Sequence, residues 1–202
     1  MASSDLYGGV FHIVVQGEAG ATAVPVSGPV TDAQLRATAV AVLPSAQEVH
    51  LGQVGGTTTM ITVTPTLDTN IYADGDILFN PVAIPAAVRV AGGTAILQDV
   101  VVYDLSDQGI AFDILIMTAA TSLGTINSAP NIADDNATDI IARFSSIDFY
   151  DMGAFRVGTL SNLAKVVKAV AGTTSLYAAG ISRGAGTYAA AGLKLTFGLL
   201  QD

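Results

Sequence analysis

Apolar runs along this chain are short, and small and β-branched residues dominate them. Gly, Pro, Asn and Asp residues stand between the runs. β-branched residues favour extended backbone, and the residues between the runs favour turns. The sequence therefore predicts an all-β fold. About nine short strands with one short helix predict an antiparallel β-sandwich with jelly-roll or Greek-key connections.

Charged residues make up only 12% of the 202 residues, about half of the roughly 25% that is usual for soluble domains. A free monomer with so few charges has little polar surface with which to cover itself. We therefore expect much of the surface to be buried against other protein subunits. The length suits one domain with an appendage better than two complete domains.

The net charge is −9, from 17 acidic and 8 basic residues. Such a chain repels the phosphate backbone, so we expect no nucleic-acid partner. The longest uncharged tracts, residues 52–67 and 114–133, are interrupted by Thr, Gly, Pro or Asn, so we expect no membrane partner. Residues 1–5 lack the basic region of a signal peptide. The absence of cysteine excludes disulfides, thiolate nucleophiles and Cys-ligated zinc.

Residues 1–56 are predicted to form an extended N-terminal arm. Residues 9–16 favour one strand, but Pro25, Pro29 and Pro44 each lack a backbone N–H and cannot occupy a central strand. We expect this arm to order on a partner or on copies of itself; a flexible linker is the alternative. The apolar residues that we expect to anchor the arm on its partner are Val24, Val26, Leu35, Val40 and Val42.

Residues 57–202 are predicted to form the β-sandwich domain, with strands near 57–65, 77–79, 147–150, 155–157, 165–170, 174–181 and 193–200. Residues 88–117 predict a three-stranded meander of strands 88–90, 94–103 and 110–117. Residues 133–144 predict the one helix, because Asp134 and Asp135 suit a helix N-terminus and three apolar residues follow on one side. Residues 182–186 predict a hairpin loop between the last two strands.

Catalytic residues are scarce in this chain. Its two histidines, His12 and His50, both lie in the arm, whereas a Ser-His-Asp triad needs a histidine that a third group holds rigidly. The stretch from Ser182 to Thr187 contains Gly184 and Gly186 but lacks the frame and the lysine of a phosphate-binding loop. We expect a non-catalytic protein without a cofactor.

Two groups of acidic residues could hold a metal ion. Asp74 and Asp76 flank a glycine turn, and Asp134, Asp135 and Asp139 stand close together in sequence. Ca²⁺ takes six to eight oxygen ligands, but neither group completes an EF-hand. A β-turn explains the first group and the charge of a helix N-terminus explains the second, and we prefer these explanations to a metal site. We predict no metal site, and Ca²⁺ binding remains the alternative.

A hydrolase of surface polysaccharide is the alternative from the enzyme class. Asp74, Asp76 or Asp113 would act as acid and base, with the two carboxyl groups roughly 5–10 Å apart in a cleft. Sugar-binding clefts usually carry aromatic platforms, and this chain has no Trp and only 6% aromatic residues. The composition therefore disfavours this alternative.

Several stretches resemble structural proteins of tailed-phage virions. They are Val24–Ala37 (VPVSGPVTDAQLRA), Thr64–Asp76 (TPTLDTNIYADGD), Leu97–Asp107, Leu176–Gly184 (LYAAGISRG) and Leu199–Asp202. The resemblance implies a capsid decoration (cement) protein in the virion, assembled in the host cytoplasm. It would be a homotrimer that binds the outer surface of the major capsid protein shell through its arm. The alternative is a head fibre, collar or tail appendage that contacts the host surface through residues 118–131 and 182–192.

Overall fold

The computed structural model describes residues 56–145 and 147–202. The predicted strand at residues 9–16 and the five anchor residues of the arm lie outside the described residues. The first strand of the fold begins at Thr57.

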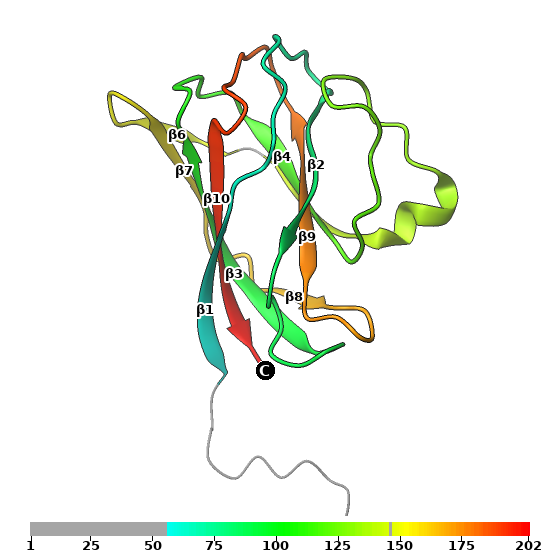
Figure 1. Ribbon diagram of the computed structural model, residues 1–202. Coiled ribbons are helices and arrows are strands. Elements are labelled where there is room, and N and C mark those ends of the chain that lie inside the picture. Colours follow the sequence, from blue (N-terminus) through cyan, green and yellow to red (C-terminus); the bar gives the residue numbers. More distant parts are fainter. Residues whose placement is uncertain (1–55, 146) are drawn as a thin grey trace, which may run out of the picture. The chain divides into compact units, whose positions relative to one another are not determined.

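The described residues form two antiparallel sheets that face each other (Figure 1). Sheet A has the order β1-β10-β3-β7-β6. Both β7 and β8 pair with the same edge of β3, β7 with residues 100–104 and β8 with residues 94–97. Its strands are β1 (Thr57–Val63), β3 (Thr94–Asp104), β6 (Phe149–Asp151), β7 (Arg156–Leu160), β8 (Lys165–Lys168) and β10 (Leu193–Gln201). Sheet B has the order β2-β9-β4-β5. Its strands are β2 (Ile77–Ile84), β4 (Phe112–Met117), β5 (Ile140–Phe144) and β9 (Leu176–Ser182).

The chain crosses repeatedly between the two sheets. β1 to β4 alternate between sheets A and B, β5 stays in sheet B, β6 to β8 lie in sheet A, β9 returns to sheet B and β10 returns to sheet A. Each sheet thereby acquires neighbours that are far apart in sequence, such as β1 with β10 and β2 with β9. This is jelly-roll connectivity, and it confirms the prediction of an all-β antiparallel sandwich.

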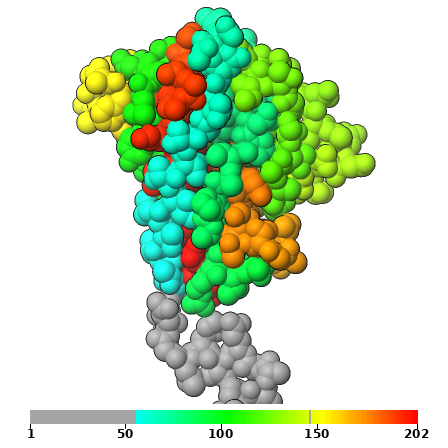
Figure 2. Space-filling model, viewed as in Figure 1, coloured from blue at the N-terminus to red at the C-terminus, as the bar shows by residue number. Residues whose placement is uncertain are grey.

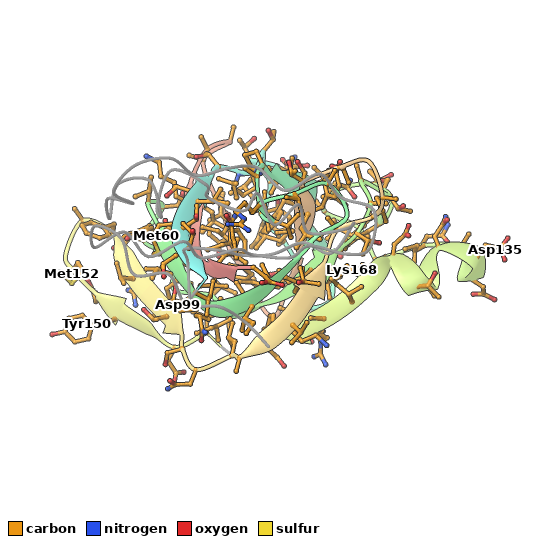
Figure 3. The ribbon with its side chains drawn as sticks, turned by 90° about the horizontal axis from the view of Figure 1, so that it is seen from below. Met60, Asp99, Asp135, Tyr150, Met152 and Lys168 are labelled. Carbon is orange, nitrogen blue, oxygen red and sulfur yellow. The ribbon has the colours of Figure 1, made fainter. Side chains whose placement is uncertain are left out.

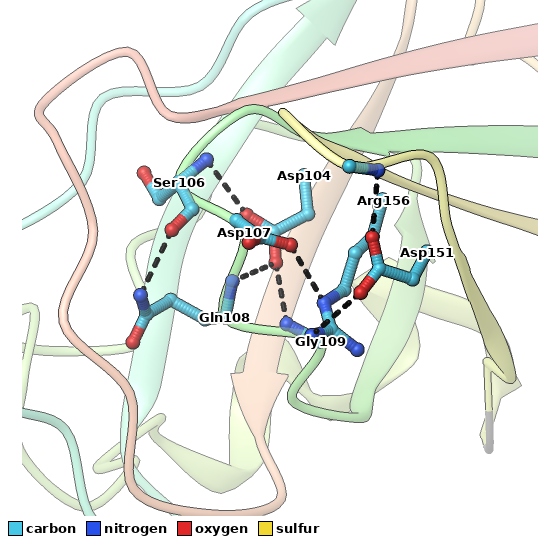
Figure 4. Close-up of polar contacts among 8 residues, drawn as sticks. Asp104, Ser106, Asp107, Gln108, Gly109, Asp151 and Arg156 are labelled. Atoms are coloured by element: carbon cyan, nitrogen blue, oxygen red, sulfur yellow. Dashed lines mark hydrogen bonds and ion pairs between the residues drawn. The ribbon is translucent and has the colours of Figure 1, made fainter.

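The predicted meander at residues 88–117 is wrong. β3 lies in sheet A and β4 in sheet B, and Val88–Val90 is not a strand. The connection after β3 turns at the buried carboxylate of Asp104, which accepts hydrogen bonds from the backbone N–H groups of Ser106, Gln108 and Gly109 at 2.9, 2.8 and 2.7 Å (Figure 4). This carboxylate satisfies the turn's donors, so the chain can leave sheet A without pairing back onto β3.

The predicted helix at residues 133–144 is also wrong in most of its length. Only Asp134–Asp139 forms a 3₁₀ helix, η1, and Ile140–Phe144 forms β5. β5 pairs with β4 from Ile114 to Met117. This long-range pairing overrides the local pattern because β-branched Ile140 and Ile141 suit a strand as well as a helix.

The predicted hairpin after residue 182 is wrong for the same topological reason. β9 and β10 belong to different sheets, so residues 183–192 cross the end of the sandwich. Tyr188 is buried within this connection, and its ring packs edge-on against that of Tyr72, with 6.0 Å between the ring centroids. Burial raises the pKa of Tyr188 well above its usual range.

The main hydrophobic core fills the space between the two sheets. Phe112 of sheet B packs against Phe79 of the same sheet and Phe149 of sheet A, with 6.3 Å between ring centroids in each pair. Gly180 on β9 leaves room for the ring of Phe79, since a Cβ at this position would collide with it. These aromatic contacts join β2, β4 and β6 across the sandwich.

A second, smaller cluster lies on the outer face of sheet B. Residues 118–139 run across this face and contribute Leu123, Ile126 and Ile132 to it. Asn80 fixes this segment by donating a hydrogen bond to the Gly124 carbonyl at 2.8 Å and accepting one from the Leu123 N–H at 2.9 Å. Figure 2 shows this yellow-green segment as a layer along one side of the molecule. Sheet B is therefore covered on both faces by its own chain.

None of the helices in the described ranges is long and apolar enough to cross a bilayer.

Candidate protein-binding surface

The outer face of sheet A presents apolar side chains to solvent. Strand residues alternate between faces, and the inward side chains of Val100, Val102, Leu195 and Phe197 are fully buried. The strand register aligns their outward neighbours in four rows across the sheet. These rows are Tyr150–Val157–Tyr103–Lys194, Thr159–Val101–Thr196–Thr62, Asp99–Gly198–Met60, and Val166–Ile96–Leu200–Thr58.

Three residues of this face are highly exposed for their type. Tyr150 is 75% exposed, Val166 64% and Met60 56%. Figure 3 places Met60, Asp99 and Tyr150 on one side of the molecule, away from Asp135 of η1. The water-facing side of an antiparallel sheet usually carries polar residues. Here most residues are apolar or threonine, so both faces of sheet A are suited to burial.

The two sheets differ in how their outer faces are covered. Residues 118–139 cover sheet B, whereas no hydrophobic cluster of the described chain lies on the outer face of sheet A. A contiguous exposed apolar patch on a folded protein usually marks a protein contact. The outer face of sheet A is therefore the candidate functional site.

Asp99 and Lys194 are the charged residues in these four rows. The Asp99 carboxylate lies over Gly198, where an added Cβ would collide with Asp99 Oδ1. This oxygen is buried and has no hydrogen-bond partner within the described part of the chain. Lys194 is exposed and makes no ion pair with any described residue.

The carboxylates that the sequence suggested as metal ligands either accept hydrogen bonds or lie exposed on the surface. Asp76 Oδ2 accepts the Ala73 N–H at 2.7 Å, and Asp139 Oδ2 accepts a hydrogen bond from the Thr121 hydroxyl. Asp134 and Asp135 are exposed on η1. Across residues 56–145 and 147–202, no three His, Asp or Glu side chains come together in a way that would hold a metal ion.

Asp113, a candidate acid or base from the sequence, is the centre of an ion-pair cluster on sheet B. Its side chain is 1% exposed and accepts hydrogen bonds from Arg143 Nε at 2.8 Å and Arg183 Nε at 2.9 Å. Arg183 Nη1 also lies 3.8 Å from Asp74 Oδ1. Burial by itself raises the pKa of Asp113, but hydrogen bonds and charge from Arg183 and Arg143 outweigh burial and lower it.

Protonation of Asp113 is expected to destabilise the fold in acid. Its pKa is lower in the folded than in the unfolded state, so its contribution is complete above about pH 4, the ordinary aspartate value, and is lost as pH falls through the folded value. Asp113→Asn should lower the free energy of unfolding at neutral pH by about 2 kcal/mol, since both arginines still reach solvent. It should also flatten the acid dependence of stability.

Urea unfolding measured from about pH 2 to 7 checks this expectation. Asp134→Asn is the matched control, because Asp134 is exposed and forms no ion pair within the described residues. An unchanged acid dependence in Asp113→Asn would show that the cluster does not govern acid stability.

The face of sheet A left one signal in the sequence. Val100–Tyr103 is an unbroken apolar run within an antiparallel strand, which places apolar side chains on both faces. The five predicted anchors of the arm lie outside the described residues, and so do the two histidines, His12 and His50. The loops suggested for host contact are partly packed on the fold, since Leu123 and Tyr188 are buried.

Comparisons with known proteins assign no family to this chain. No protein-family model matches it, and no curated protein matches it. The crystal structure of an infectious bursal disease virus VP2 subviral particle aligns with 71% of this chain and 40% of that chain, at 14% identity and a TM-score of 0.18. The structure of the Gx strain of the same virus aligns with 72% and 37%, at 14% identity and a TM-score of 0.17. The chain thus spans less than half of either protein, and TM-scores this low carry no argument about function.

Proposed function

We propose that this protein is a non-catalytic structural subunit of a virion, a capsid decoration (cement) protein. Its arm, residues 1–56, binds the outer surface of the major capsid protein shell, and copies of its sandwich associate above the shell and stabilise it. Assembly takes place in the host cytoplasm.

The outer face of sheet A is the observation that carries this proposal. An exposed apolar sheet face on a chain with 12% charged residues favours a contact with another protein subunit. Jelly rolls occur in viral capsid proteins, lectins and cupins, so the fold is compatible with this role but does not select it. On a shell, symmetry multiplies a weak contact, because linked copies gain avidity without tight binding by each one.

Particles that lack the protein provide the test. The full chain should bind them and raise the temperature at which they rupture. A full-length variant in which Val24, Val26, Val40 and Val42 are each changed to Asp should bind at least about 100-fold more weakly, because each charge would have to be desolvated at the contact. The matched control places the same number of aspartates at Ser3, Ser4, Thr22 and Ser45. Equal binding by both variants would refute anchoring through the arm.

Counting copies per particle separates this function from a head fibre, collar or tail appendage. A decoration protein should approach the copy number of the major capsid protein, because it occupies equivalent sites over the whole shell. A few copies per particle would refute decoration in favour of a vertex or tail position.

A further inference from the structure

We propose that the outer face of sheet A is the surface through which two copies of this chain pack on each other, face to face about a two-fold axis. The inference rests on the assembly role proposed above and names the occupant of this face. It differs from the trimer that the sequence resemblance implies.

The size of the face suits such a pair. Strands lie about 4.8 Å apart and rise about 3.4 Å per residue. The width of the face is five strand positions and its length is that of β10, nine residues, so the area of the face is roughly 600–700 Å². A standard specific interface buries about 800 Å² per partner, whereas crystal-packing contacts bury well under half of that. The face is therefore large enough for a weak to moderate dimer.

The charges of the face favour a second copy as the occupant. The whole chain carries −9, so two copies repel each other over most of their surface. The four rows of this face carry one Asp and one Lys, and exposed Lys168, which pairs in register with Thr94 beyond the fourth row, adds a positive charge at the edge. An apolar face without excess negative charge is the part of this acidic protein that an identical copy can approach most easily.

Asp99 and Lys194 cannot satisfy each other within one chain. Lys194 pairs in register with Tyr103, and Gly198, under the Asp99 carboxylate, lies four residues further along β10, about 14 Å away. A two-fold axis that runs across the strands at the level of Thr196 exchanges positions 194 and 198. It places Lys194 of one copy opposite the Asp99 carboxylate of the other, twice per dimer.

Sedimentation of the full chain tests the pairing. The wild type should sediment as a dimer, and Met60→Lys with Val166→Lys should raise the dissociation constant at least about 100-fold, because both charges would enter an apolar contact. Ile71→Lys is the control, since Ile71 is 66% exposed but lies outside both sheets. A monomeric or trimeric wild type, or a double variant that dimerises normally, would overturn the inference.

A charge exchange tests the axis. Lys194→Glu and Asp99→Lys should each weaken the dimer about tenfold or more, and the two together should restore it to within about threefold of wild type. Arg89→Glu, at an exposed position outside the sheets, should have no effect. If the double variant is as weak as the single variants, the two residues do not pair and the proposed axis is wrong.

The absence of cysteine allows a third measurement that does not depend on a charged variant folding. Val101→Cys in the full chain should be protected from maleimide at high protein concentration and become reactive on dilution. Ile71→Cys should react equally at both concentrations. Equal reactivity of Cys at 101 at both concentrations would overturn the inference. Particle binding tests the proposed function independently of the dimer. If a chain that dimerises in this way does not bind particles, the proposed function is wrong and the dimer still stands.

Discussion

Phe112→Ala should lower the free energy of unfolding by about 3–5 kcal/mol, the usual cost of removing a fully buried phenylalanine. Phe112 stands between Phe79 of sheet B and Phe149 of sheet A, so the substitution removes two aromatic contacts and leaves a cavity between the sheets. The short edge strand β6 depends on the contact through Phe149, and we expect the β6–β7 hairpin to lose hydrogen-exchange protection first.

Two variants make this expectation specific. Phe112→Leu retains most of the volume and should cost about 1–2 kcal/mol less than the alanine variant. Met152→Ala is the control beside β6, because Met152 is 55% exposed and lies outside the four rows of the outer face of sheet A, so its removal should change stability by less than about 0.5 kcal/mol. Chemical denaturation measures all three. A loss below about 1 kcal/mol in Phe112→Ala would contradict the proposed packing across the sandwich.

Asp104→Ala should lower the free energy of unfolding by about 3 kcal/mol. The carboxylate is buried and accepts three backbone N–H groups of the turn that leads from sheet A to sheet B. Hydrogen bonds to a charged group contribute about 1.5–3 kcal/mol each, but donors of this turn regain part of that free energy when water enters. Asp104→Asn keeps one carbonyl oxygen and should lose about half as much.

Asp107 supplies the matched control in the same turn. Its side chain is 41% exposed and pairs with Arg156 Nε at 2.9 Å, and Arg156 also lies 3.4 Å from Asp151 (Figure 4). An exposed pair of this kind contributes less than about 1 kcal/mol, and Asn tolerates the positive φ of 54° at this position, so Asp107→Asn should be much milder. Thermal unfolding compares the two. Equal losses in Asp104→Ala and Asp107→Asn would contradict the role assigned to the buried carboxylate.

Local patterns predicted the strands well where a β-branched run was flanked by turn residues. Residues 57–65, 94–103 and 193–200 match β1, β3 and β10 closely. Local patterns failed where pairing with a distant strand decided the conformation. Ile140–Phe144 has apolar spacing that suits a helix, yet it pairs with β4 and forms an edge strand of sheet B. The prediction of a meander was wrong because the residues of the Asp104–Gly109 turn do not indicate which sheet the following strand joins.

The candidate surface shows the same division. Alternation in β1 and β10 predicts that Met60 and Thr196 point away from the core, but it does not place them on one face. Only the pairing of β1, β10, β3, β7 and β6 assembles residues from both ends of the domain into a continuous apolar surface. Likewise, only the tertiary structure shows that residues 118–139 cover sheet B, while no hydrophobic cluster of residues 56–145 and 147–202 covers the outer face of sheet A.

The sequence by itself determined that this domain is built from short strands, because β-branched residues and turn residues act within a few positions of each other. It also determined the low fraction of charged residues, which is one reason for proposing an assembly role. The tertiary structure decided the order of strands in each sheet and which sheet face the described part of the chain covers. Those properties depend on hydrogen bonds and packing between segments more than a hundred residues apart, such as Thr57 with Gln201, and no local pattern encodes such a choice of partner.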